Sequence, residues 1–122
     1  VRRLITDICA CSSRGGSYYG LTDYYTSAIS PYVSADKTKQ SSEVPNATKK
    51  FVESYPEYQI SAPYNFQFVN TTFPLTVKCD VDVTFTLKTG KRKRAFIHKT
   101  FYVTSEYRVS GFIDKEYKRV DL

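Results

Sequence analysis

The chain has 122 residues, which is enough for one hydrophobic core and too few for two domains. Hydrophobic residues make up 41% and charged residues 25%, which excludes a disordered chain, and the aromatic residues are 11 Tyr and 8 Phe. The net charge is +6, and it comes from one segment: residues 83–105 hold six Lys and Arg and no acid. The remaining 12 basic and 12 acidic residues balance, so a uniformly basic surface is excluded.

The first two predicted elements are amphipathic helices. Residues 1–11 repeat apolar side chains at helical spacing, and the Ser- and Gly-rich residues 12–16 end the pattern. Residues 21–33 show the same period. Their apolar stripe consists of Leu21, Tyr24, Tyr25, Ala28, Ile29 and Tyr32. Thr22 or Asp23 is expected to cap this helix, and Pro31 to close it, because proline cannot continue a helix interior.

A third helix is predicted over residues 42–54, after a polar loop. Pro45 fits only in the first turn of a helix, which places the start near Ser42. Pro56 moves the residue before it away from helical angles, so the helix is expected to end there. The apolar stripe of this helix consists of Val44, Ala47, Phe51, Val52 and Tyr55.

Beyond Pro56 the apolar period becomes that of strands. Residues 58–68 are predicted to form one long strand, with Pro63 at a bend or bulge. In residues 75–87 every odd-numbered side chain is apolar and every even-numbered one is polar, which is typical of an antiparallel sheet covered on one face. Further strands are predicted over residues 95–104 and from residue 107 to 113 or beyond. The order predicts an α+β domain in which N-terminal helices pack on a strongly curved antiparallel sheet.

The longest uncharged stretch, residues 58–77, has the length of a membrane span. It contains two Pro and several Asn and Gln residues, which hydrocarbon does not tolerate, so no membrane span is predicted. The chain begins at Val1 and contains no Met, which favours a processed chain or a domain excised from an exported or anchored protein.

The basic window centres on Thr89-Gly90, which predicts a hairpin tip between two strands. It presents a predicted basic surface made of Lys91, Arg92, Lys93 and Arg94. One interpretation is contact with nucleic acid, acidic lipid or an acidic protein. The favoured interpretation is a solvated turn whose charges protect strand edges from pairing. Nucleic acid is not the expected partner, because no known nucleic-acid-binding module accompanies the charges.

The three cysteines are Cys9, Cys11 and Cys79. Cys9 and Cys11 are too close for an ordinary disulfide and lack the second pair that a zinc site requires, so no metal site is predicted. The favoured interpretation is that the thiols are small buried side chains, and a disulfide between Cys79 and one of the other two stays open.

A pattern made mostly of tyrosines runs through the predicted second and third helices and into the first strand. It consists of Tyr24-Tyr25, Tyr32, Lys50-Phe51, Tyr55-Pro56 and Tyr58. With the order of elements, this pattern resembles bacterial members of the nuclear transport factor 2-like, or cone, superfamily. The resemblance covers residues 4–120 and implies one cone-like domain of bacterial type over residues 1–122. The helix-proline-strand junction at Pro56 then corresponds to the turn where the third helix leads into the sheet.

The resemblance implies several functions, because members of this superfamily include isomerases, cyclases, dehydratases and adaptors. Its enzymes carry a carboxylate or His inside the cone, where apolar walls tune the pKa. Asp80 and Asp82 lie on the polar face of their strand, which faces away from the interior, so they are poor candidates for a general base. His98, whose strand is apolar on both sides, is the weak catalytic candidate because it can point inward. The favoured interpretation of a single His without a placed carboxylate is a structural or surface residue. Asp114 has no partner that the sequence identifies, and no cofactor is predicted.

Six aromatic residues are expected inside the cone, as a pocket lining or as a packed core: Tyr25, Tyr32, Phe51, Tyr55, Phe66 and Phe101. The main hypothesis is a non-catalytic binding or adaptor domain that takes a small apolar ligand or a protein partner and dimerises through its sheet. The alternative is a small enzyme that acts by proton transfer on a hydrophobic substrate. A carboxylate next to a tyrosine inside the cone would favour the enzyme, and a filled interior the adaptor.

Overall fold

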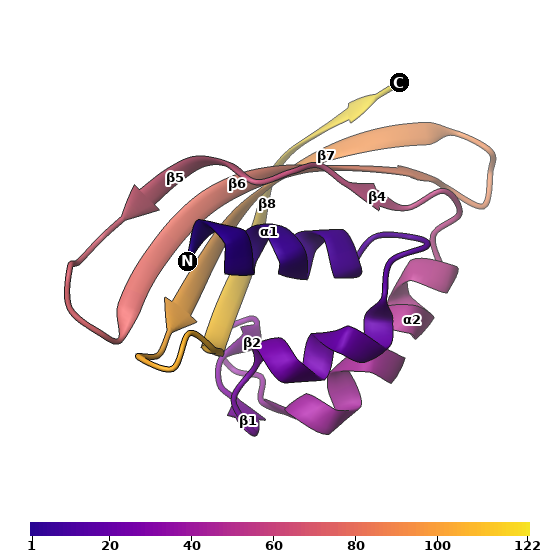
Figure 1. Ribbon diagram of the computed structural model, residues 1–122. Coiled ribbons are helices and arrows are strands. Elements are labelled where there is room, and N and C mark those ends of the chain that lie inside the picture. Colours follow the sequence, from indigo (N-terminus) through magenta and orange to yellow (C-terminus); the bar gives the residue numbers. More distant parts are fainter.

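Three helices lie on the concave side of a curved sheet in the computed structural model, which describes residues 1–122 (Figure 1). They are α1 (Arg2–Cys11), the 3-10 helix η1 (Tyr18–Tyr24) and α2 (Val44–Glu53), which follows a short 3-10 turn, η2 (Ser41–Glu43). This arrangement confirms the predicted α+β class. None of the helices has the length and apolar character needed to cross a membrane.

The main sheet has six strands. Its centre is the antiparallel series β6 (Leu75–Thr86), β7 (Arg92–Val103) and β8 (Val109–Asp121). β4 (Gln59–Ile60) and β5 (Tyr64–Phe68) both pair with β6, and the pairing of β5 shifts register between Tyr64 and Gln67. The sheet is antiparallel, as predicted, except at one edge, where β2 (Tyr32–Val33) runs parallel to β8.

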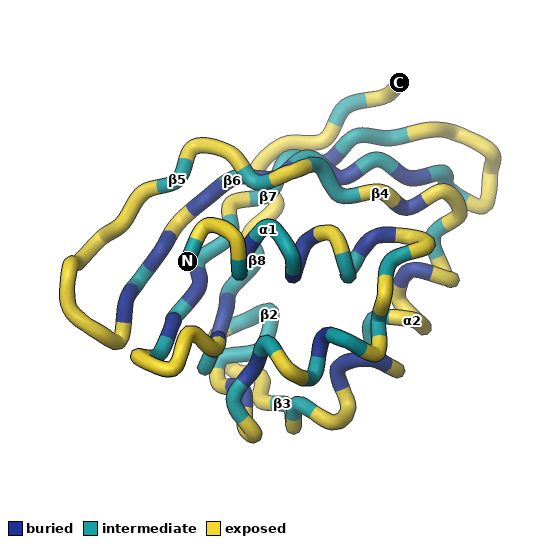
Figure 2. The backbone as a smooth tube through the Cα atoms, in the orientation of Figure 1, coloured by how far each residue is buried: buried dark blue, intermediate teal, exposed yellow.

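The alternation of β6 is confirmed in three dimensions. Its odd-numbered residues from Leu75 to Phe85 are all buried beneath the helices, and its even-numbered residues are not (Figure 2). They join the buried faces of α1 and α2, represented by Ile5, Ile8 and Val52, in one apolar core. The phase of β6 therefore fixes which residues of the neighbouring strands face the helices.

The predicted second helix is wrong beyond Tyr24. The chain after η1 forms two short strands, β1 (Ala28–Ile29) and β2, and β1 pairs with β3 (Lys39–Gln40). Backbone hydrogen bonds to β8 explain the difference, because Thr26 N–H donates to the Val109 carbonyl at 3.0 Å and Ser30 N–H to that of Ser110 at 3.0 Å. A partner strand satisfies the backbone groups that a helix would otherwise pair internally.

Pro45, Pro56, Pro63 and the hairpin tip lie where the sequence predicts them, whereas Pro31 closes no helix and lies between β1 and β2. Pro45 occupies the first turn of α2, which ends at Glu53, before Pro56. Pro63 lies in the break between β4 and β5. Gly90 has a φ of +87° at the β6–β7 turn, a conformation that glycine adopts without a steric penalty.

Candidate functional site

A cavity of about 620 Å³ lies between α2, the β2–β3 segment and the concave face of the sheet. Thirteen of its twenty lining residues are hydrophobic, so it suits a mainly apolar ligand. Its buried lining comes from Ile8 and Cys9 on α1, from Phe101 on β7 and Phe112 on β8, and from Tyr25, Val44 and Tyr58. Its exposed lining comes from residues 37–38 and from Phe51 on α2. The mouth therefore lies between α2 and the β2–β3 segment, and the base lies on the sheet.

Aromatic side chains form the base of the cavity. The Phe112 ring on β8 has its centroid 6.0 Å from those of Tyr25 and Phe101, and 5.2 Å from that of Tyr32 in an edge-on arrangement. Tyr25, Phe101 and Phe112 are all buried. Such a cluster gives the base a fixed shape, because rotation of one ring would require its neighbours to move.

An ion pair lies among these rings. Lys99 on β7 and Asp114 on β8 are register partners, and Lys99 Nζ donates a hydrogen bond to Asp114 Oδ1 at 2.9 Å. Both side chains line the cavity and retain only 11% and 25% of their exposure. The Lys99 ammonium also lies 5.8 Å and 5.7 Å from the ring centroids of Phe101 and Phe112.

The charge state of Lys99 follows from two opposing effects. Burial is the largest single effect and lowers the pKa of Lys99. The attraction of the Asp114 carboxylate, its hydrogen bond to Lys99 and the smaller contributions of Cys9 and Tyr58 together outweigh burial, so the pKa of Lys99 is raised. Lys99 is therefore a charged donor at neutral pH.

The cavity tyrosines are uncharged donors. Burial raises the pKa of Tyr58 to about 12 and also raises the pKa of Tyr25 and Tyr32. The Cys9 thiol lines the same cavity, and burial raises its pKa too, so it is not a nucleophile at neutral pH. All three cysteines are free thiols.

The raised pKa of Tyr58 predicts a loss of stability at alkaline pH. The unfolded chain releases this proton near pH 10 and the folded chain near pH 12, so the contribution is complete below about pH 10 and declines above it. In Tyr58→Phe the free energy of unfolding should fall less steeply between about pH 10 and about pH 11.5 than in the wild type. Urea unfolding across this range measures it. Tyr19→Phe, at an exposed position, is the control, and an unchanged slope in Tyr58→Phe would contradict the prediction.

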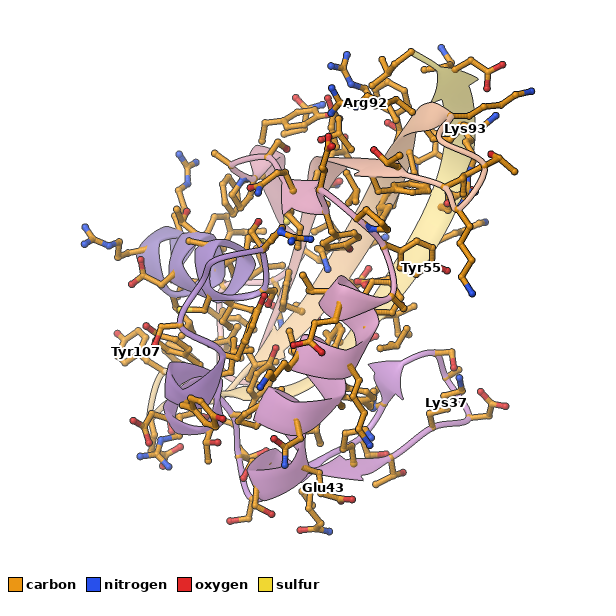
Figure 3. All side chains as sticks on the ribbon, turned by 90° about the vertical axis from the view of Figure 1, so that its right-hand side faces the viewer. Lys37, Glu43, Tyr55, Arg92, Lys93 and Tyr107 are labelled. Atoms are coloured by element: carbon orange, nitrogen blue, oxygen red, sulfur yellow. The ribbon has the colours of Figure 1, made fainter.

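Four of the six aromatic residues expected inside the cone line the cavity: Tyr25, Tyr32, Phe51 and Phe101. The other two lie outside its lining. Tyr55, which is labelled in Figure 3, follows α2. Its ring packs edge-on against that of Phe85, with ring centroids 5.4 Å apart. Phe66 lies on β5, where the Arg2 guanidinium is 5.3 Å from its ring centroid. The aromatic content of the sequence thus serves both the cavity and the packing around it.

His98 lies outside the cavity, on the outer face of the sheet, so it does not take the inward position that would make it a catalytic candidate. Its side chain is 53% exposed, its Nδ1 is 2.6 Å from Asp80 Oδ1, and its ring stacks on Tyr117 with centroids 3.8 Å apart. Asp80 and Asp82 occupy the same outer face, as predicted, and Asp82 accepts a hydrogen bond from Tyr64. The physical reason is register: His98 is opposite Asp80, so both share the polar phase of β6.

Sequence patterns did not lead to Lys99 as a site residue or to the partner of Asp114. A signal was present, because Lys99 alternates with Ile97 and Phe101, which places all three on one face of the strand. An ionisable residue in an apolar phase marks a candidate site. To predict that Lys99 pairs with Asp114 also requires the register between β7 and β8, which the sequence alone does not provide.

The predicted basic surface is partly neutralised within the chain. Arg92 lies 3.7 Å from Glu57, and Lys93 pairs with Asp121. Figure 3 shows Arg92 and Lys93 at the opposite end of the molecule from Lys37. The basic surface and the cavity are therefore separate features.

No protein-family model matches the sequence, and no curated protein matches it. Solved structures do resemble it. SalBIII, described as an epoxide hydrolase/cyclase-like enzyme with a role in pyran ring formation in the polyether salinomycin, superposes with a TM-score of 0.72 at 11% identity, covering 98% of this chain and 94% of its own. A candidate polyketide cyclase from Xanthomonas campestris pv. campestris gives 0.69 at 10% identity, covering 92% and 86%.

A protein of unknown function from Exiguobacterium sp. 255-15, described as NTF2-like, gives a TM-score of 0.65 at 11% identity and covers 95% of this chain and 96% of its own. These similarities define the class: the chain has the nuclear transport factor 2-like fold, as the tyrosine pattern and element order predicted. At such low identity they show the fold alone.

Proposed function

We propose that the chain is a cone-type binding domain that holds one small, mainly apolar molecule in its cavity, with a polar group of that molecule against Lys99 and Asp114. The observation that carries the proposal is the charged pair at the base of an otherwise apolar cavity. The volume of about 620 Å³ falls within the range of small-molecule sites.

The polar groups at the base favour a ligand carbonyl or hydroxyl. The Lys99 ammonium has donors beyond the one given to Asp114, and the carboxylate retains acceptor capacity. Tyr25 and Tyr58 add protonated hydroxyls along the lining. A carbonyl oxygen can accept from Lys99 or a tyrosine, and a hydroxyl can donate to Asp114 as well. The aromatic base contributes apolar contact area to the rest of the molecule.

A second function has its own supporting observation: a carboxylate, Asp114, inside the cone beside tyrosines. In an enzyme, Asp114 would accept a proton from the substrate, and Lys99 would stabilise negative charge on a substrate oxygen. The enzymes SalBIII and the candidate polyketide cyclase, which share the fold, favour this alternative. It ranks second because Lys99 already neutralises the carboxylate. A natural ligand that is incubated with the protein distinguishes the two functions. Recovery of the ligand unchanged favours the binding domain, and its conversion to a product favours the enzyme.

Filling the cavity should weaken ligand binding. The neutral probe N-phenyl-1-naphthylamine, which fluoresces in apolar surroundings, is expected to bind the wild type. Ala47→Trp places an indole in the cavity from α2, and we expect its affinity for the probe to fall at least about tenfold, the cost of about 1.4 kcal/mol of lost contact. Fluorescence titration measures this change.

The matched control is Asn46→Trp, which adds the same side chain to the same helix at an exposed position outside the lining. Its affinity should match that of the wild type. Absence of probe binding to the wild type, or equal binding by Ala47→Trp, would contradict the binding function. Circular dichroism and thermal unfolding establish that both variants are folded.

A further inference from the structure

Two lysines stand at the mouth of the cavity without acidic partners. Lys37 and Lys39 both line it, and neither takes part in any of the seven ion pairs of the chain. At the base, the charges of Lys99 and Asp114 cancel. The cavity therefore has a neutral base and a mouth with two uncompensated positive charges.

The fold holds these lysines in place. Tyr32 N–H donates to the Lys37 carbonyl at 2.9 Å, and Lys37 N–H donates to the Ser34 carbonyl at 3.1 Å, which closes the turn after β2. Lys39 lies on β3 opposite Ile29, and its Nζ is 5.2 Å from the ring centroid of Tyr32, a cavity residue. The nearest acid in sequence, Asp36, accepts a hydrogen bond from Ser34 and does not line the cavity.

We infer that the ligand is an amphipathic organic anion, an aromatic or aliphatic body with one carboxylate, which enters body first and leaves its carboxylate between Lys37 and Lys39. This inference rests on the proposed binding function and adds the chemical class and orientation of the ligand. The apolar lining excludes water from the body, whereas the carboxylate stays near solvent and does not incur the cost of full burial. Charge complementarity at the mouth also favours the approach of anions over cations.

The test compares three probes with the same naphthalene body: 2-naphthoate, the neutral 2-naphthamide and the cation 2-naphthylmethylamine. Each is titrated by calorimetry and by displacement of N-phenyl-1-naphthylamine. Because exposed ion pairs are individually weak, we expect 2-naphthoate to bind about three- to tenfold more tightly than 2-naphthamide, and the amine to bind most weakly. About 0.5 M salt should remove most of this preference, since it screens exposed charges.

The variant Lys37→Gln/Lys39→Gln should lose the preference for 2-naphthoate and keep the affinity for 2-naphthamide. The control Lys49→Gln/Lys50→Gln removes the same charge from exposed positions on α2 outside the cavity and should behave as the wild type. A merely global effect of net charge would affect both variants equally and would overturn the inference.

The outcomes separate the two proposals. If N-phenyl-1-naphthylamine binds and 2-naphthoate binds no more tightly than the amide or the amine, the anion inference fails and the binding function stands. If the neutral probe binds but none of the naphthalene probes displaces it, the inference also fails. If N-phenyl-1-naphthylamine does not bind, both proposals fail.

Discussion

Replacing Asp114 by Ala is expected to lower the free energy of unfolding by about 3 kcal/mol, the cost of leaving a buried charge without its partner. Lys99 keeps only 11% of its side-chain exposure, so in Asp114→Ala its ammonium would have no carboxylate and little contact with water. Lys99→Met should cost less, about 1–2 kcal/mol, because Asp114 is more exposed and water can solvate it. Urea unfolding near neutral pH measures both changes.

The double variant Lys99→Met/Asp114→Leu should recover most of this loss and unfold within about 1 kcal/mol of the wild type, because an apolar pair of similar size removes the desolvation cost with the attraction. The control is Asp7→Ala, which breaks the Arg3–Asp7 ion pair on the surface of α1, where the Arg3 Nε to Asp7 Oδ1 distance is 3.1 Å. This change should lower the free energy of unfolding by less than about 1 kcal/mol. Additive losses in the double variant would contradict this account. If the Lys99–Asp114 pair contributes little net free energy of unfolding, stability does not explain its place at the base of the cavity, and a role in ligand binding is supported.

Gly111→Ala is expected to destabilise the protein by about 2–3 kcal/mol, as other substitutions that overfill a packed site do. A Cβ atom at this position would lie 2.5 Å from the Ser30 carbonyl oxygen and 2.8 Å from Pro31 Cδ. The backbone of residues 30–31 cannot withdraw freely, because Ser30 N–H donates to Ser110 and Phe112 N–H donates to Pro31. The clash should therefore separate β2 from β8.

The same substitution should weaken binding of N-phenyl-1-naphthylamine, because β2 carries Tyr32 and Val33 of the cavity lining. Gly20→Ala is the matched control: a Cβ there meets only Ser17 Oγ, at an ordinary 3.5 Å, and its stability should stay within about 1 kcal/mol of the wild type. Thermal unfolding and fluorescence titration give the two readouts. Equal behaviour of the two variants would show that the close approach at Gly111 is not tight.

Much of the fold could be predicted because several elements carry their own local signal. The strict alternation over residues 75–87 identifies β6 and its buried face, since a side chain in a strand has only two directions. Pro45 and Pro56 bracket α2 because proline restricts the backbone wherever it occurs. These signals, with the tyrosine pattern, were sufficient for the α+β class and the fold.

The second helix shows where local signals fail. Residues 21–33 have a helical apolar period, yet only the part up to Tyr24 is helical, and β1 and β2 follow. The hydrogen bonds that decide this come from β8, about 80 residues further along the chain. A pairing between distant segments can override a weak local preference.

Spacing along one segment was enough to predict the α+β class, the bounds set by Pro45 and Pro56 and the buried phase of β6, and the aromatic content named four of the residues that line the cavity. Only the tertiary structure decided that Lys99 meets Asp114, that His98 faces outward, and that Lys37 and Lys39 stand at the mouth. The physical reason is that a site joins side chains from separate strands and loops. Their distances depend on strand register and chain packing, which no single segment encodes.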